Sequence, residues 1–206
     1  MSFLACVAAA GLSFAFVDLP VARRFAPSIG HLDALGAGLG SAVLLTLEGL
    51  TALALIAVRL LRGRLSLFGE ALALASLTSM CVYAMNDGVL KLFFGVPGPA
   101  SVLLDGAHHG FHLLAGGQGS GFPSGHMALA AAFGGTFMTL IPASRWPLSA
   151  LLVVGAVILV VGDWHFVSDV IAGGFVGLSA GALAGALWRV HSNWGAKGSA
   201  TPSPPR

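Results

Sequence analysis

Three short groups of polar residues stand between long apolar stretches of the chain. The first is Pro123-Ser124-Gly125-His126, at the start of an apolar run. Ser124 is a good N-cap for a helix, and Gly125 lets a ligand come close to the backbone. The unpaired N–H groups and positive dipole end of such a helix form an anion site. His126, in the first turn, is placed to hydrogen-bond an anion and to give it a proton.

The other two groups are Lys91, and His165 with Asp169 four residues later. If a helix has begun by His165, these two side chains lie on the same face. A carboxylate beside an imidazole fixes the tautomer, leaves the other ring nitrogen free and stabilises the cation formed after attack. Lys91 adds a positive charge for a phosphate oxygen. The three groups together predict nucleophilic attack on a phosphate ester.

The composition of the chain is that of a membrane protein. Of its 206 residues, 56% are hydrophobic and only 9% are charged, against about 25% charged residues in ordinary globular chains. The mean hydropathy is +0.90. A soluble fold would lack the charge to cover its surface, so the composition excludes a nucleic-acid binder, a disordered linker protein and a cytosolic enzyme.

Apolar runs that approach the roughly 20 residues needed to cross about 30 Å of hydrocarbon occur six times. We therefore predict an all-α fold, a polytopic six-transmembrane-helix bundle over residues 1–192, with residues 193–206 as a disordered tail. No Lys or Arg precedes the first run, so it is read as a retained helix. The third span could extend through Met85 towards Leu92. The spans are Phe3–Leu19, Leu35–Leu61, Leu67–Tyr83, Ser124–Ile141, Pro147–Gly162 and Phe166–Trp188.

Two features inside these spans are interpreted as structural. Glu48 falls at the middle of the second span, where a bare charge is costly, so we expect it to be protonated or paired inside the bundle. The last span carries a glycine at every fourth position, which forms a smooth stripe where another helix can approach closely. These glycines are Gly173, Gly177, Gly181 and Gly185.

The basic residues divide unequally between the two sides of a six-span protein. Seven fall on the side of the termini and three on the other, which predicts cytoplasmic termini. The long loop 96–122 and the turn 162–169 then face outward, so the site is extracytoplasmic in a multi-pass cell-membrane protein, and periplasmic in a bacterium. The seven are Arg59, Arg62, Arg64, Arg145, Arg189, Lys197 and Arg206; the three are Arg23, Arg24 and Lys91.

These motifs, by their order and their expected place on one side of the membrane, resemble those of the type 2 phosphatidic acid phosphatase (PAP2) superfamily of lipid phosphate phosphatases. The resemblance covers roughly Asn86 to Gly174, its Pro-Ser-Gly-His match is complete, and the six spans fit the membrane members of the family. It implies that His165 attacks phosphorus and becomes a phosphohistidine, oriented by Asp169. His126 would protonate the leaving lipid alkoxide and then activate water. The phosphoryl oxygens would be held, without a metal or a cofactor, by Lys91, Ser124 and Gly125.

The chain departs from the family pattern at two phosphate-clamping arginines. Gly98 stands where the first is expected and Leu159 where the second is expected; each arginine would make a bidentate contact that lysine cannot reproduce. Asp163 adds a carboxylate two residues before the expected nucleophile. Three interpretations follow: loop histidines replace the arginines, the substrate is a phosphodiester with a cationic head group, or the protein is weak or inactive. The loop histidines are His108, His109 and His112.

The substrate and several alternatives stay open at this point. Phosphatidic acid, phosphatidylglycerol phosphate, polyprenyl (di)phosphate and lipid A phosphates are all compatible with a lipid phosphate partner that arrives from the membrane. A phosphotransferase or phosphodiesterase would use the same histidines. A membrane scaffold, or a haem carrier with two histidine ligands, would not be an enzyme of this kind. The His108-His109-x-x-His112 cluster also invites a metal site, which its glycine-flanked loop disfavours. The sequence does not predict the oligomeric state.

Overall fold

The computed structural model describes residues 2–26, 37–117 and 119–198, and this part of the chain is helical. It contains no strand, and one isolated β-bridge joins Pro97 and Ser120. The all-α prediction is therefore confirmed. In chain order the elements are α1 (Phe3–Phe16), α2 (Asp18–Phe25), α3 (Ala37–Arg62), α4 (Leu67–Met85), the π-helix η2 (Asn86–Leu90), α5 (Lys91–Phe94), α6 (Pro99–Leu103), α7 (Gly125–Leu140), the 3₁₀ turn η3 (Pro142–Ser144), α8 (Arg145–Val161) and α9 (Val167–Gly198).

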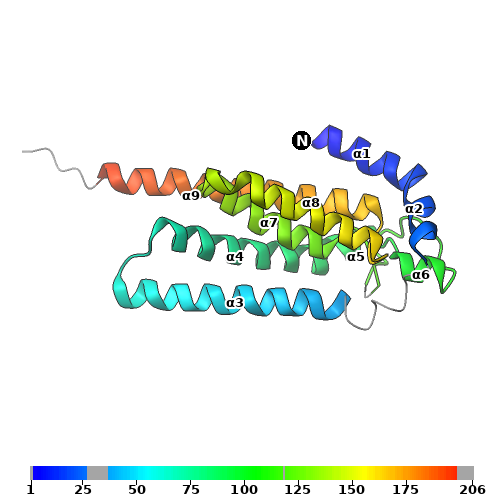
Figure 1. Ribbon diagram of the computed structural model, residues 1–206, viewed down its shortest axis with the longest axis horizontal. Helices are drawn as coiled ribbons and strands as arrows, with labels where there is room; N and C mark the ends of the chain where they lie inside the picture. Colours follow the sequence, from blue (N-terminus) through cyan, green and yellow to red (C-terminus); the bar gives the residue numbers. More distant parts are fainter. Residues whose placement is uncertain (1, 27–36, 118, 199–206) are drawn as a thin grey trace, which may run out of the picture.

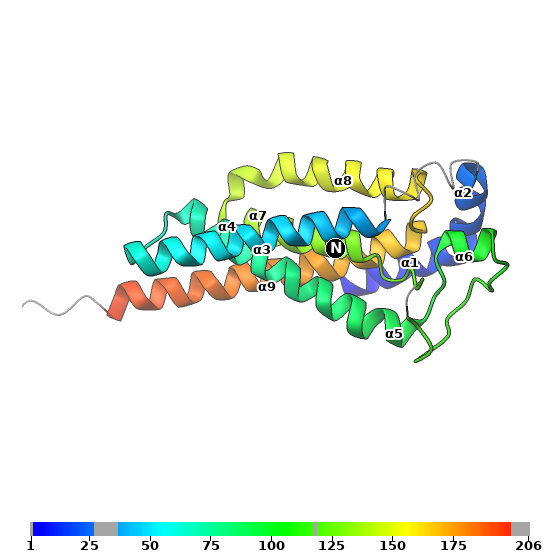
Figure 2. The ribbon, with the colours of Figure 1, turned by 90° about the horizontal axis from the view of Figure 1, so that it is seen from below.

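The long helices α3, α4, α7, α8 and α9 run side by side along one axis (Figures 1 and 2). Helix α7 is the centre of this bundle, since it packs against α3, α4, α8 and α9 and most of its residues are buried. The outward faces of the surrounding helices are apolar, with Leu60, Leu61 and Trp146 among the most exposed side chains. A hydrocarbon solvent is the environment in which such a surface is stable.

The glycine stripe of α9 packs directly on α7, as the sequence predicts. A methyl group added at Gly173, Gly177 or Gly181 would collide with the backbone carbonyl of Ser124, Ala128 or Ala132 of the facing chain segment, respectively. At Gly185 the same methyl group would lie 2.8 Å from Cβ of Thr139. The two helix backbones therefore approach closely over several turns, as small-residue interfaces allow in membranes.

Replacing one glycine of this stripe is expected to destabilise the bundle. In Gly177→Ala the new methyl group would lie 2.7 Å from Cβ of Ala131 and 2.8 Å from N of Ala132, so α7 must shift. We expect a loss of about 1–3 kcal/mol and a lower Tm in detergent, typical of overpacking. Gly155→Ala is the matched control, because nothing lies within 4 Å of its added methyl group. Equal melting temperatures for the two variants would contradict this account of the α7–α9 contact.

The structure supports four membrane-crossing helices among the described residues, or five if a bent pair counts as one span. The bent pair is α1 and α2, which meet at an angle of 57°, so the predicted span Phe3–Leu19 is not one continuous helix. Helix α7 has 16 residues and is therefore about 24 Å long, short of the hydrocarbon thickness of about 30 Å. Each of the six predicted segments contains a helix within its described residues, but six spans stay a prediction.

Three predicted boundaries differ in the structure. The third span continues through η2 and α5 to Phe94, so its suggested extension past Met85 is present. The loop 96–122 contains the short helix α6. Helix α9 continues to Gly198, past Trp188 and into the segment read as a tail; Leu35 and residues 199–206 lie outside the described residues.

Glu48 is paired inside the bundle, as expected for a carboxyl group at that depth. The hydroxyl of Ser79, on α4, donates a hydrogen bond to its Oε2. The contact ties α3 to α4 within the apolar part of the molecule and leaves Glu48 in a structural position.

Candidate active site

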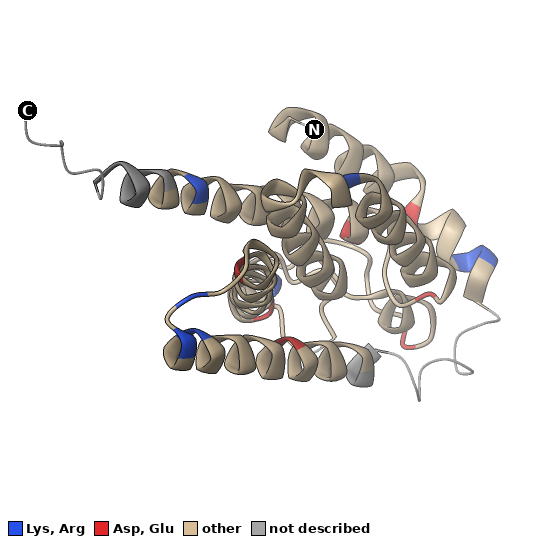
Figure 3. Cartoon of the chain, turned by 60° about the vertical axis from the view of Figure 1, so that its left-hand side comes forward, with Lys and Arg blue, Asp and Glu red and all other residues tan. Residues whose placement is uncertain are grey.

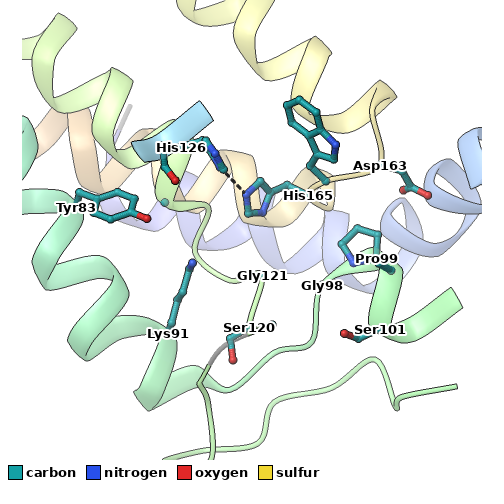
Figure 4. A pocket seen from close by; sticks show the side chains of 15 residues that line it. Tyr83, Lys91, Gly98, Pro99, Ser101, Ser120, Gly121, His126, Asp163 and His165 are labelled. Atoms are coloured by element: carbon teal, nitrogen blue, oxygen red, sulfur yellow. Dashed lines mark hydrogen bonds between the residues drawn. The ribbon is translucent and has the colours of Figure 1, made fainter. Parts of the chain in front are cut away.

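A cavity of about 340 Å³ opens at the end of the bundle where α7 begins and where α5 and α6 lie (Figures 1 and 4). It is built from segments far apart in the sequence: the start of α3, the α4–α5 region, α6, the loop before α7, and the turn between α8 and α9. Its lining contains four of the six residues that the motifs single out. The lining residues are Ser41, Tyr83, Lys91, Gly98, Pro99, Ala100, Ser101, Gly119, Ser120, Gly121, Gly125, His126, Asp163, Trp164 and His165.

The two motif histidines meet in this cavity although they are 39 residues apart. Nδ1 of His126 lies 3.4 Å from Nε2 of His165 (Figure 4). Nδ1 of His165 lies 3.5 Å from Oδ2 of Asp169. Since the ring of His165 stands between a carboxylate and a second imidazole, one ring nitrogen faces Asp169 at ion-pair distance while the other faces the cavity and His126. This is the arrangement of an oriented nucleophile beside an acid–base group.

Asp169 is held by the start of α9 rather than by a helical turn shared with His165. The helix begins at Val167, so His165 precedes it, and the condition for placing both side chains on one helix face is not met, although the two side chains do meet. The backbone N–H of Phe166 donates to Oδ2 of Asp169 at 2.9 Å, which is the reciprocal half of a capping box. The N–H of His165 donates to the carbonyl of Leu159 at 3.2 Å. Backbone groups therefore fix the carboxylate and the imidazole independently.

Gly121 lets the chain pass close to this carboxylate, a role that the sequence did not reveal. A Cβ at position 121 would lie 2.8 Å from Oδ2 of Asp169 and 3.0 Å from Cα of Gly98. Any side chain there would displace the Asp169 carboxylate or the Gly98 backbone. The only sequence signal is its place two residues before the Pro-Ser-Gly-His motif, in a loop with many other glycines.

Ser124 caps α7, as predicted, through a hydrogen bond that its Oγ accepts from the N–H of Met127 at 3.2 Å. Its side chain is fully buried and does not line the cavity, whereas Gly125 does. Asn86 fixes the segment before α7, since its Nδ2 donates to the carbonyl of Pro123 at 3.0 Å. The start of α7, with backbone N–H groups that have no helical acceptor, therefore points at the cavity.

Lys91 reaches the same helix terminus from the opposite wall (Figure 4). A Cβ at Gly125 would lie 3.7 Å from Nζ of Lys91 and 3.2 Å from the ring of Tyr83. The π-helix η2 ends just before Lys91; π-turns inside helices are often found at functional sites. Nζ of Lys91 also donates to Oδ1 of Asp87 at 2.8 Å. The positive charge of Lys91 is therefore partly compensated by an exposed carboxylate.

The two positions that lack the family's arginines have different environments. Gly98 lines the cavity, in an extended conformation that any residue can adopt. Leu159 is buried in an apolar cluster with Met127, Ala131 and Val170. Position 98 therefore faces the site, whereas position 159 belongs to the packing between α7, α8 and α9.

Asp163 lines the cavity, so the carboxyl group that the sequence places two residues before His165 faces the site. It is buried and lies in the turn between α8 and α9 with a positive φ of 56°. In the close view it stands beyond Pro99, on the side of the cavity away from Lys91 (Figure 4). The cavity consequently has an ammonium group on one wall and a carboxylate on the other.

The loop histidines do not replace the missing arginines in this cavity, which corrects the first of the three interpretations. His108 and His112 line a neighbouring cavity of about 380 Å³, and His112 contacts the carbonyl of Gly95 through Nδ1 at 3.2 Å. His109 turns to another side, where its Nε2 lies 3.6 Å from Oδ2 of Asp18. The cluster that looks contiguous in the sequence is thus divided between two places.

Some side chains of the site carry no sequence signal strong enough to single them out. Tyr83 and Trp164 supply aromatic walls, and the Trp164 ring lies 6.4 Å from that of His126 between centroids. Asn86 is the exception, because a polar residue in an apolar helix five positions before Lys91 could have been noticed. The aromatic residues are common at membrane interfaces for other reasons.

Comparison with known proteins gives one match. A family model described as the PAP2 superfamily matches residues 68–195, which include all the motif residues above. No curated protein and no solved structure matches the chain significantly.

Proposed function

The chain belongs to the PAP2 superfamily, and from that premise we propose that it is a membrane-embedded phosphatase that hydrolyses a lipid phosphate monoester or diphosphate through a phosphohistidine intermediate. The observation that carries the proposal is the contact series from His126 to His165 to Asp169 at the wall of a cavity. The series supplies a nucleophile, its orienting carboxylate and a second proton-transfer group within contact range, as in-line displacement requires.

In the first step Nε2 of His165 forms a bond to phosphorus, and the bond between phosphorus and the lipid oxygen breaks. The leaving oxygen takes a proton from His126, whose ring lies beside the nucleophile. Asp169 stabilises the positive charge that develops on the His165 ring through Nδ1. The products of this step are a phosphohistidine and the lipid alcohol or, for a diphosphate substrate, the lipid monophosphate.

In the second step water attacks the phosphohistidine, and the N–P bond breaks. The now neutral His126 accepts the proton of the water, so both histidines return to their starting states. Lys91 and the N-terminus of α7 stabilise the phosphoryl oxygens in both steps, since fixed positive groups act where charge is spread over those oxygens. Ser124 contributes by fixing the helix terminus through its cap.

An apolar cavity supports a substrate with a hydrocarbon tail. It has a volume of about 340 Å³ and lies between α3, α7 and α8. Leucine side chains make up most of its lining, and Phe133 and the Ser79-paired Glu48 also line it. Leu44 follows Ser41 by one turn on α3, and Leu129 follows His126 by one turn on α7, so the two cavities are one helical turn apart along both helices. A lipid whose phosphate group lies in the first cavity would have its apolar chain in the second.

The distribution of basic residues supports an outer-leaflet site. Lys and Arg gather where α3 passes into α4, at the end of the bundle away from the cavity (Figure 3). Arg59, Arg62 and Arg64 lie in that region, and Arg145 begins α8 at the same end. Under the positive-inside rule this distribution supports the proposal of cytoplasmic termini and an extracytoplasmic cavity.

The purified protein is expected to release phosphate from at least one lipid phosphate in detergent, with EDTA present. The panel contains phosphatidic acid, phosphatidylglycerol phosphate, a polyprenyl phosphate and a polyprenyl diphosphate. Quenching in alkali during turnover of ³²P-labelled substrate should trap an acid-labile label on the protein. No release from any lipid, or release without trapped label, would contradict the proposal.

A phosphodiester substrate is the second candidate, because Lys91 and Asp163 stand on opposite walls of the cavity. A zwitterionic head group carries a phosphate and a cation that match those two charges, and a singly charged diester has less need of arginines. Transfer of the head-group phosphoryl to an added alcohol, with no free phosphate, would favour this candidate.

Restoring one arginine should strengthen binding of a dianionic phosphomonoester. A Cβ at Gly98 would have only ordinary contacts, 3.6 Å to the carbonyl oxygen of Gly119 and 3.9 Å to Cα of Gly121, so Gly98→Arg can be accommodated. A guanidinium contact to phosphate should lower KM by about 10-fold or more. Gly98→Gln is the control of similar reach without charge. An equal KM change in both variants would show that the missing charge is not what limits binding.

A further inference from the structure

A buried carboxylate, Asp18, joins the N-terminal helices to the start of α9. It lies at the first position of α2 and is 1% exposed. Ser168, which is 150 residues away, donates to it twice: its N–H to Oδ1 at 3.0 Å and its hydroxyl to Oδ2. The hydroxyl of Ser13, on α1, donates to Oδ1 at 3.3 Å. A buried carboxylate with several donors is held in one orientation.

The long loop before α7 contributes a fourth contact to this carboxylate. Nε2 of His109 lies 3.6 Å from Oδ2 of Asp18. The His109 ring stacks on Phe14 with centroids 4.3 Å apart and contacts Phe166 at 4.5 Å. Asp18 is therefore the meeting point of α1, α2, the loop and α9.

Asp18 contacts the same turn of α9 that carries the proposed catalytic carboxylate. Ser168 precedes Asp169 in the first turn of α9, and the carbonyl of Asp169 accepts the N–H of Ser124 at 3.0 Å. The same turn is thus tied to Asp18 on one side and to the Pro-Ser-Gly-His segment on the other. The position of the Asp169 side chain, and through it that of His165, depends on both attachments.

We propose that Asp18 is a positioning residue for the Asp169–His165 pair and acts through its two hydrogen bonds to Ser168. The inference rests on the proposed function. It assigns a role in the reaction to the N-terminal bent helix pair, which lies outside the segment that the family model matches. Since Asp18 does not line the cavity, it acts on the nucleophile and not on the bound substrate.

Ser168→Ala is the decisive variant, and Ser13→Ala is its matched control. Both replace a buried serine that donates to Asp18, but only Ser168 belongs to the turn that carries Asp169. We expect Ser168→Ala and Asp18→Asn to lower kcat by about 10- to 100-fold with KM within twofold, because orientation of the nucleophile matters in the transition state. Ser13→Ala should keep kcat within twofold. Equal kcat for the two serine variants would overturn the proposal.

A second measurement keeps this test separate from the proposed function. In ¹⁵N-histidine spectra of the full chain in detergent, the His165 ring signals are identified by their loss in His165→Ala. They should shift in Ser168→Ala and stay in place in Ser13→Ala. Shifted signals in a protein that hydrolyses no lipid would refute the phosphatase and support the positioning role. Unshifted signals in an active enzyme would refute the positioning role alone. The positioning role would also be refuted if kcat fell in proportion to Tm in both serine variants.

Discussion

The His165→Ala protein is expected to release no measurable phosphate from any lipid phosphate, with a fall in kcat of about 10⁴-fold or more, as when the nucleophile of a catalytic triad is removed. The physical reason is that His165 presents one ring nitrogen to the cavity while its other ring nitrogen lies 3.5 Å from the Asp169 carboxylate. Without it the covalent intermediate cannot form, so no acid-labile label should remain on the protein.

The control for this variant is His191→Ala, an exposed histidine near the C-terminal end of α9. It should release phosphate at the rate of the unaltered protein. Both variants should elute as that protein does, because the backbone N–H of His165 is held by the carbonyl of Leu159 whatever the side chain. Phosphate release by His165→Ala at more than a few per cent of the unaltered rate would refute the phosphohistidine mechanism.

The His126→Ala protein should lose about 10²- to 10⁴-fold in kcat on lipid phosphates, the usual contribution of general acid–base catalysis. The loss should depend on the leaving group. A lipid alkoxide needs a proton from His126 as it leaves, whereas a nitrophenolate does not. With p-nitrophenyl phosphate the first step should therefore survive in large part, and the phosphohistidine should accumulate because no base activates water.

The measurement is a rapid-quench comparison of the two substrates, with a burst of nitrophenolate and trapped label as the readout. His112→Ala serves as the control, since His112 lines the neighbouring cavity and contacts Gly95 instead of His165. An equal loss on both substrates, with no accumulated label, would show that His126 does not act as the acid and base proposed here.

The local chemistry of the site could be predicted because it depends on neighbours in the chain. Ser124 as the cap of α7 and the close-packed glycine stripe of α9 follow from helix geometry alone. The pairing of His165 with Asp169 was predicted correctly, but for the wrong local reason. The helix starts after His165, and the carboxylate reaches back while it caps the helix.

The number of spans is less well determined by the sequence, because hydropathy gives apolar length and not helix continuity. The first apolar run looks uniform, yet its helix ends at Phe16 and the chain bends before Asp18. Asp18 accepts a hydrogen bond from Ser168, a contact across 150 residues that no local pattern reveals. Likewise, three adjacent-looking loop histidines separate because only His109 packs between Phe14 and Phe166.

By itself the sequence determined an apolar, helical chain suited to a membrane and the three motifs on which the chemistry proposed for Lys91, His126 and His165 rests. These depend on composition, on periodicity and on contacts within a few residues. Only the tertiary structure decided that the two imidazoles lie 3.4 Å apart, that Gly121 makes room for Asp169 and that Asp18 supports it from behind. The reason is that these contacts join segments whose approach is set by the packing of α7 against its neighbours, and packing is a property of the whole bundle.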